Sequence, residues 1–144
     1  MLQGREAIFS ALFNLVSAVP GLVTTGRRLV HWSEVPPDQQ PALFQAQKTQ
    51  NAQPRPLGVP TKWTLKADLY LYVNSGGDSS SVSATPLNNY LDAIEAALAP
   101  NIMSGVQTLG GLVKHCFICG EVLTDEGTLG SQAVAIIPIE IQAV

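Results

Sequence analysis

Residues 62–73 read KWTLKADLYLYV and carry the clearest structural signal in this sequence. Every second residue is apolar, and the residues between them are threonine, lysine, aspartate and two tyrosines. Strict alternation with a period of two predicts a β-strand with one buried face and one wetter face. Tyr70 and Tyr72 fall on the wetter face, and their size predicts packing against a second layer or against another chain.

A helix is predicted on each side of this strand. Residues 4–19 repeat apolar side chains at helical spacing, and Pro20 ends the pattern because proline cannot continue the hydrogen-bond ladder. The second helix runs to about residue 99. Thr85 is its predicted cap, with Pro86 in the first turn.

Further strands are predicted at 22–33, 42–49, 112–122 and 132–142 from their apolar and β-branched content. Pro138 lies inside the last of these segments. Because proline has no N–H for the ladder, the strand is expected to be an edge strand or to be bulged at that point.

The segments between these elements are rich in turn formers. Residues 34–60 are predicted to be a protruding arm or loop with a proline-rich end, and 75–85 a flexible loop. Residues 124–127 are predicted to be a turn, in which Gly127 can adopt positive φ.

The order of elements shows no regular strand–helix–strand alternation. It predicts an α+β fold with an antiparallel, possibly mixed, sheet of four to five strands and two helices packed on one face. A length of 144 residues fits one domain covering 1–144.

The composition favours contacts with other protein chains. Apolar residues make up 46% of the sequence and charged residues only 13%, which is about half the usual share. Part of the surface is therefore expected to be buried against other copies, because interface cores are depleted of charge.

Other binding classes have little support in the sequence. The eight basic residues are scattered, with only Arg27 and Arg28 adjacent, so a concentrated phosphate-binding footprint is not predicted. No stretch approaches the length of apolar sequence that spans a membrane, and residues near the start do not resemble a signal peptide. A cytoplasmic protein with reduced cysteines is expected.

The sequence Cys116-Phe117-Ile118-Cys119-Gly120 suggests a metal or redox site. Zinc needs four ligands, however, and residues three apart in a strand point to opposite faces. Two packed residues without chemical function are therefore favoured, with a metal-binding or redox module as the alternative.

Other candidate groups have equally simple structural interpretations. Neither His31 nor His115 has a nearby set of serine, cysteine and carboxylate that the local sequence identifies as a triad. Asp125 and Glu126 are interpreted as solvated turn formers that could also pair with a basic residue of another subunit. We predict no catalytic, cofactor-binding or metal-binding residue, no cofactor and no enzymatic activity, with a hydrolase kept only as a remote alternative.

The most distinctive motifs lie in the C-terminal third. They are QTLGGLV at 107–113, HCFICG at 115–120, DEGTLG at 125–130 and QAVAIIPI at 132–139. The segments REAIF at 5–9 and LDAIEAAL at 91–98 agree with them. Together they resemble the tail terminator, or tail completion, proteins of long-tailed bacteriophages.

The resemblance implies a structural phage protein in the tail or neck of the virion, assembled in the cytoplasm of the bacterial host. It implies a hexameric ring that caps the tail tube, stops its polymerisation and offers a surface for head joining. The implied partners are copies of the same chain, the tail tube protein and a head-completion or connector protein. Double-stranded DNA would only pass through the ring, and no membrane is involved.

A head-to-tail contact repeated by rotation closes into a ring when the angle fits. Strand addition is the expected mode of contact, with the arm at 41–60 and the strand at 132–142 as candidate edges. The predicted interface residues are Arg27, Arg28, Phe44, Asp125, Glu126 and Pro138. The arginines are expected to face Asp125 or Glu126 of a neighbour. The alternative function is a head–tail connector or a tube-like subunit.

Overall fold

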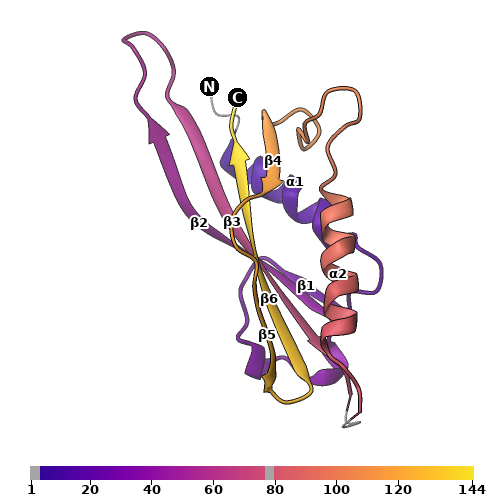
Figure 1. Cartoon of the computed structure of the whole chain (residues 1–144). Coiled ribbons are helices and arrows are strands. Elements are labelled where there is room, and N and C mark those ends of the chain that lie inside the picture. Colours follow the sequence, from indigo (N-terminus) through magenta and orange to yellow (C-terminus); the bar gives the residue numbers. More distant parts are fainter. Residues whose placement is uncertain (1–3, 77–79) are drawn as a thin grey trace.

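The computed structural model describes residues 4–76 and 80–144, and it confirms the predicted α+β class (Figure 1). Its helices are α1 (Arg5–Ser17) and α2 (Ala84–Ala97). Its strands are β1 (Thr24–Gly26), β2 (Ala42–Gln53), β3 (Lys62–Asn74), β4 (His115–Ile118), β5 (Leu123–Leu129) and β6 (Gln132–Gln142). Short 3-10 turns are present at Trp32–Glu34 and Pro37–Gln39.

The strands form one mixed sheet in the order β1-β2-β3-β6-β4, and β5 pairs with β6 on the same side as β4. Only β1 is parallel to its neighbour among the described pairs. The sheet has six strands where four to five were predicted, because β5 forms in a segment where the sequence predicted a turn at 124–127. The strands predicted at 62–73 and 132–142 are confirmed as strands, and they lie next to each other in the interior of the sheet.

Both helices pack on one face of the sheet, as predicted. The buried residues of α1 and α2 share one apolar cluster with alternate residues of β3 and β6. Leu65, Leu69 and Leu71 point into this core from β3, and Ile137 and Ile139 point into it from β6. The period-two pattern of the sequence therefore identified the face of the sheet that the helices cover.

The opposite face of the sheet is covered in part by residues 28–40 of the same chain. A second buried cluster contains Val35, Phe44 and Tyr72. The Tyr72 hydroxyl donates a hydrogen bond to the Val30 carbonyl at 2.7 Å, and burial raises the pKa of Tyr72 to about 12. The second layer expected over the tyrosines is thus supplied, for Tyr72, by this returning segment.

The strand predicted at 22–33 is wrong beyond β1. Residues Trp32–Glu34 form a 3-10 turn, and the His31 side chain accepts a hydrogen bond from the Ser33 amide at its start. Pro36 and Pro37 then restrict the backbone. The local hydrogen bonds and the prolines direct this segment across the sheet face instead of along an edge.

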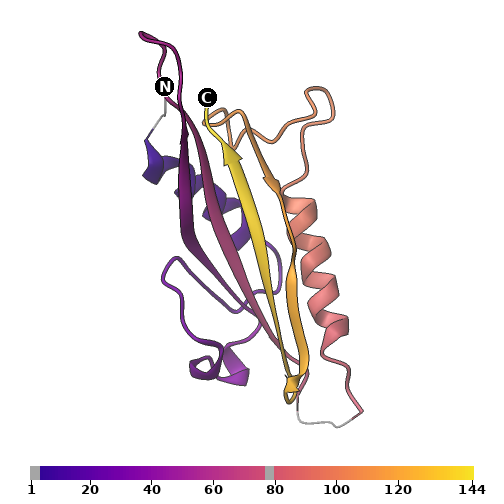
Figure 2. The ribbon, with the colours of Figure 1, turned by 60° about the vertical axis from the view of Figure 1, so that its left-hand side comes forward.

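The β2–β3 hairpin extends beyond the rest of the molecule (Figures 1 and 2). Residues 54–61 form its end and are all exposed; we call them the arm. The predicted arm at 34–60 is too long, because Ala42–Gln53 pairs with β3 as strand β2. The sequence predicted this strand only as far as residue 49, because the glutamine-rich second half of β2 lacks the apolar alternation that marks a half-buried strand.

Strand β6 has partners on both sides, so of the two alternatives for Pro138 the edge strand is wrong. On the side of β4 and β5 the ladder is irregular at this point, since residues 119–122 lie opposite residues 137–138. The Pro138 carbonyl accepts a hydrogen bond from the Cys119 amide at 3.0 Å. Pro138 has no N–H to return, and the neighbouring strand stops there and turns at Gly120, where φ is +115°. This break separates β4 from β5.

Two predicted local features are also corrected. Residues 124–127 belong to β5 rather than to a turn, and the chain reverses at Gly130 and Ser131 between β5 and β6. Helix α2 begins at Ala84, and its cap residue Ser83 makes no side-chain capping bond, so Thr85 is not the cap. The predicted flexible loop at 75–85 includes residues 77–79, which lie outside the described residues.

Candidate subunit-interaction surfaces

The cysteine pair does not form a site of paired thiols. Cys116 is buried, and burial raises the pKa of its thiol to about 12, whereas Cys119 is exposed. They lie on either side of the point where β4 ends. Within the described residues, no group of three or more histidine, cysteine, aspartate or glutamate side chains is placed to hold a metal ion.

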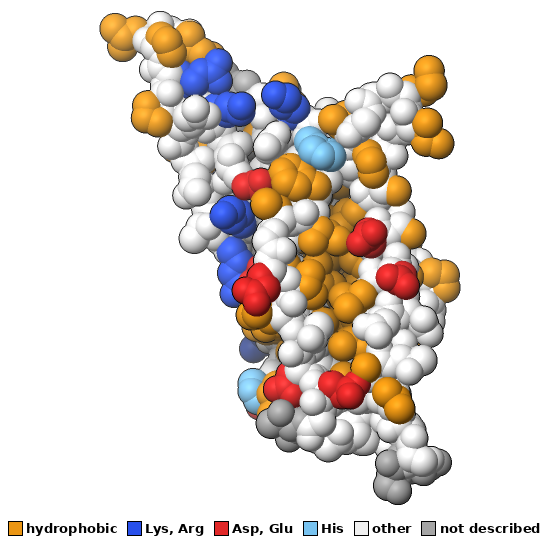
Figure 3. Space-filling view, in the orientation of Figure 1, with side chains coloured by type: hydrophobic (Ala, Val, Ile, Leu, Met, Phe, Trp, Pro, Cys, Tyr) orange, Lys and Arg blue, Asp and Glu red, His pale blue; other side chains and the backbone are white. Residues whose placement is uncertain are grey.

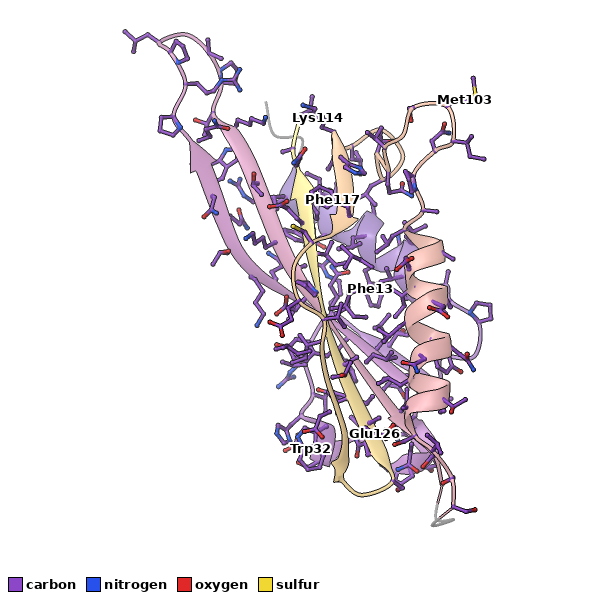
Figure 4. The ribbon with its side chains drawn as sticks, viewed as in Figure 1. Phe13, Trp32, Met103, Lys114, Phe117 and Glu126 are labelled. Atoms are coloured by element: carbon purple, nitrogen blue, oxygen red, sulfur yellow. The ribbon has the colours of Figure 1, made fainter. Side chains whose placement is uncertain are left out.

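Each histidine takes part in local structure. His31 Nδ1 lies 2.7 Å from the Ser33 hydroxyl, and its ring lies beside Trp32, which Figure 4 labels. The His115 ring stacks on Phe117 with centroids 4.6 Å apart, and its Nδ1 accepts a hydrogen bond from the Gln107 amide. These contacts position loops and strands, and the hydroxyl beside the His31 ring belongs to Ser33 in the same 3-10 turn.

Charge divides the chain into two unlike parts. Residues 1–66 hold seven of the eight basic residues and only three of the eleven acidic ones. Residues 67–144 hold one basic residue, Lys114, and the other eight acidic residues. The fold keeps these parts apart: basic side chains follow the β2–β3 hairpin, and acidic ones lie mainly over α2 and the β4–β6 region (Figure 3). The basic residues that appear scattered in the sequence are therefore gathered in space.

On the basic side, several cations already have partners within the chain. Arg27 forms an ion pair with Glu6 and donates to the Gln47 side chain, and Arg27 holds the pKa of Glu6 below its usual value. Lys48 lies 3.8 Å from an Asp68 carboxylate oxygen. Arg27 is thus engaged inside its own subunit, while Arg28 is exposed.

Some cations on this side hydrogen-bond or stack on neutral side chains. Lys48 donates a hydrogen bond to the Tyr70 hydroxyl at 3.1 Å, and this bond raises the pKa of Lys48. Arg5 donates to the Gln50 side chain and lies over the Trp63 ring, 4.6 Å from its centroid. The basic side is therefore well organised along β2 and β3, below the arm.

The acidic side lacks comparable partners. Asp92 and Glu95 lie on α2, Glu121 lies in the break between β4 and β5, and Asp125 and Glu126 lie on β5. None of the five forms an ion pair with another residue in 4–76 or 80–144. The pairing of Asp125 or Glu126 with Arg27 or Arg28 of a neighbour remains a prediction.

An apolar groove lies beside these carboxylates. It is about 240 Å³ in volume and is open to solvent at the end of α2 nearest β4. We call it the α2–β4 groove; its lining residues are Glu95, Leu98, Ala99, Pro100, Phe117 and Ile118. Figure 3 shows apolar side chains continuing between α2 and the β4–β5 strands, with acidic side chains beside them. Figure 4 labels Phe117 at this position.

Two loops at one end of the molecule present apolar side chains to solvent. Leu57 on the arm is fully exposed, and Val59 is partly so. Ile102 and Met103 are also almost fully exposed, at the end of a loop whose Asn101 side chain accepts hydrogen bonds from the amides of Met103 and Ser104. Figures 1 and 4 show the arm and this loop projecting from the same end on opposite sides.

Two of the predicted interface residues do not project from the surface. Phe44 is 4% exposed and packs against Tyr72 with ring centroids 5.7 Å apart, so it supports the fold. Pro138 is half-buried in the middle of the sheet. The exposed Leu57 and the groove-lining Glu95 were not among the predicted interface residues, although the opposite charges of the two halves of the sequence were a signal for the acidic side.

Comparisons with protein-family models and with curated proteins found no match to this chain. No helix in the described part of the chain is long and apolar enough to cross a membrane.

Proposed function

We propose that this chain is a structural, non-enzymatic phage protein that forms a ring at the head-proximal end of the tail tube. In this role it stops tube polymerisation and provides the surface for head joining. The single observation that carries the proposal is the opposite charge of the two long sides of one molecule. A head-to-tail contact brings the two unlike sides together in every copy.

The same contact can repeat between successive copies of the chain. When two different surfaces bind each other, the growing assembly still carries one unused copy of each surface at its ends. Further copies therefore add until the rotation between neighbours closes a ring. Complementary charge steers such encounters and disfavours contacts between like sides. The ring number of six and the place in the virion follow from the resemblance, and the apolar residues at one end, Ile102 and Met103, are suited to a partner stacked on the ring.

Mass measurement tests this proposal directly. Native mass spectrometry followed by electron microscopy should show closed rings, either of the protein alone or at the ends of tubes formed by the tail tube protein. Addition of the chain to growing tube protein should shorten the tubes. Incorporation along the tube would instead identify a tube-like subunit, and a protein that neither forms rings nor binds tube ends would contradict the proposal.

The Ile102→Ser, Met103→Ser double variant separates the two kinds of contact. Both side chains lie outside the core, so the fold and the ring should be retained. Tube capping should weaken if this loop meets the stacked partner. Leu29→Ser, at another exposed apolar position, is the matched control and should cap tubes as the unmodified protein does.

A further inference from the structure

We propose that the arm of one copy binds in the α2–β4 groove of the next copy, with Leu57 entering the groove and Arg55 facing Glu95. This inference rests on the proposed function, because it names the contact that joins neighbours in the ring. The occupant is a second copy of the same chain.

The arm has the form of a preorganised ligand. It contains three prolines, and the Val59 amide donates a hydrogen bond to the Pro56 carbonyl at 3.1 Å across a turn. Gly58 has φ of +82° at the third position of that turn, as a type II turn requires. Leu57 is therefore held at the outermost point, and restricted backbone freedom lowers the cost of ordering the arm on binding.

The groove offers the apolar contacts that the Leu57 side chain lacks in its own chain. Its floor is formed by apolar side chains of residues 98–100, which directly follow α2, and of β4; its lining contains one carboxylate, Glu95. Removing a fully exposed leucine and an open apolar groove from water together is favourable, and the effect grows with the area buried. Neither surface has a covering element within the described residues.

Charge determines which surface the arm would select. The sequence contains no acidic residue between Asp38 and Asp68, and the arm carries Arg55 within that stretch. On the other side, no basic residue occurs between Lys66 and Lys114. An arm bound near Glu95 brings a cation to a carboxylate that has no ion pair among the described residues.

The geometry excludes binding of the arm to the groove of its own chain. Figures 1 and 2 show the arm extending from the β2–β3 hairpin, with the rest of the sheet between it and α2. A contact between arm and groove must therefore link two molecules. Each copy donates one arm and accepts another, which is the directional contact that a ring requires.

Disulfide trapping tests the contact. Leu57→Cys and Phe117→Cys are combined in a Cys119→Ser background, which removes the exposed native thiol and leaves the buried Cys116. Mild oxidation of assembled particles should give a ladder of covalent oligomers that ends at the ring number. The matched control pairs Leu57→Cys with Ser33→Cys, an exposed position on residues 28–40, and should give no ladder.

A charge exchange gives a second, independent readout. Arg55→Glu and Glu95→Arg should each raise the concentration needed for half-assembly about tenfold, and the double variant should restore it. Glu34→Arg, an exposed acidic residue elsewhere, should have no effect. Rings that form normally but show neither a ladder nor rescue would overturn this inference and leave the proposed function intact. Failure to form rings or to bind tube ends would count against the proposed function itself.

Discussion

The two edges of the sheet differ in how extensively they are contacted by other parts of the same chain. At the β1–β2 edge, Arg27 binds Glu6, Arg5 binds Gln50, and residues 28–40 cover the adjoining face. The β4–β5 edge is interrupted at Gly120, and beside it lie an apolar groove and carboxylates that form no ion pair within residues 4–76 and 80–144. One edge is closed by contacts within the chain, and the other has fewer such contacts among the described residues.

The difference shows why exposure alone does not identify an interface. Charged residues are abundant on the basic side, but several of them serve the fold, as Arg27 does. On the acidic side the charges have no such role among the described residues, so the groove and its carboxylates are the better candidates.

The largest expected difference is between leucine truncations at the two edges. Leu43 on β2 is completely buried, and Leu43→Ala should lower the free energy of unfolding by about 3 kcal/mol because it leaves a cavity. Leu123 on β5 is 52% exposed, and Leu123→Ala should cost below about 1 kcal/mol. Urea denaturation followed by circular dichroism measures both. Equal losses would contradict the assignment of β5 as the open edge.

The break between β4 and β5 should be the next most sensitive feature. Gly120 has φ of +115°, and a Cβ there would lie 3.4 Å from Pro138 Cγ. Gly120→Ala should therefore cost about 2 kcal/mol through backbone strain. Glu121→Ala, its exposed neighbour, is the control and should be close to neutral. A neutral Gly120→Ala would show that the break does not depend on glycine.

The sequence predicted the centre of the fold much better than its edges. The segments that became β3 and β6 alternate apolar residues because one face is buried under two helices, so a local pattern reflects a global feature. The second half of β2 has glutamines on both faces, and only its pairing with β3 reveals it as a strand. Tertiary hydrogen bonds of this kind leave no periodic signal.

The interaction surfaces were harder to predict for a similar reason. Arg27 and Phe44 were reasonable candidates by residue type, but contacts with Glu6 and Tyr72 occupy them. The α2–β4 groove is formed by residues about twenty positions apart, and no local motif marks it. The division of charge between the two halves of the sequence was visible. Only the fold, however, shows that the two halves place their charges on different sides of the molecule.

Removal of the Tyr72 hydroxyl tests one hydrogen bond that holds residues 28–40 near the β1–β2 edge. Tyr72→Phe should cost about 1 kcal/mol because the Val30 carbonyl loses its donor. The raised pKa adds a pH signature. Since the folded value of about 12 exceeds the ordinary value of 10.0, this contribution is complete below pH 10.0 and is lost as the pH rises toward 12. Wild type and variant should therefore converge in strongly alkaline urea titrations, and a constant gap would exclude this bond as the cause.

The smallest expected effect concerns the ion pair at the closed edge. Arg27 and Ser10 both donate to Glu6, and they lower its pKa below the ordinary value of 4.5. A lowered folded pKa contributes stability above 4.5 that is lost as the pH falls through the folded value. Glu6 is fully exposed, so solvent screening keeps the contribution small. Glu6→Gln should thus be slightly less stable than wild type at neutral pH and equal to it in strong acid. Glu34→Gln is the control, because the Glu34 carboxylate forms no ion pair in the described residues, and this variant should be as stable as wild type at both pH values. If Glu6→Gln remains less stable than wild type in acid, the effect comes from packing rather than from charge.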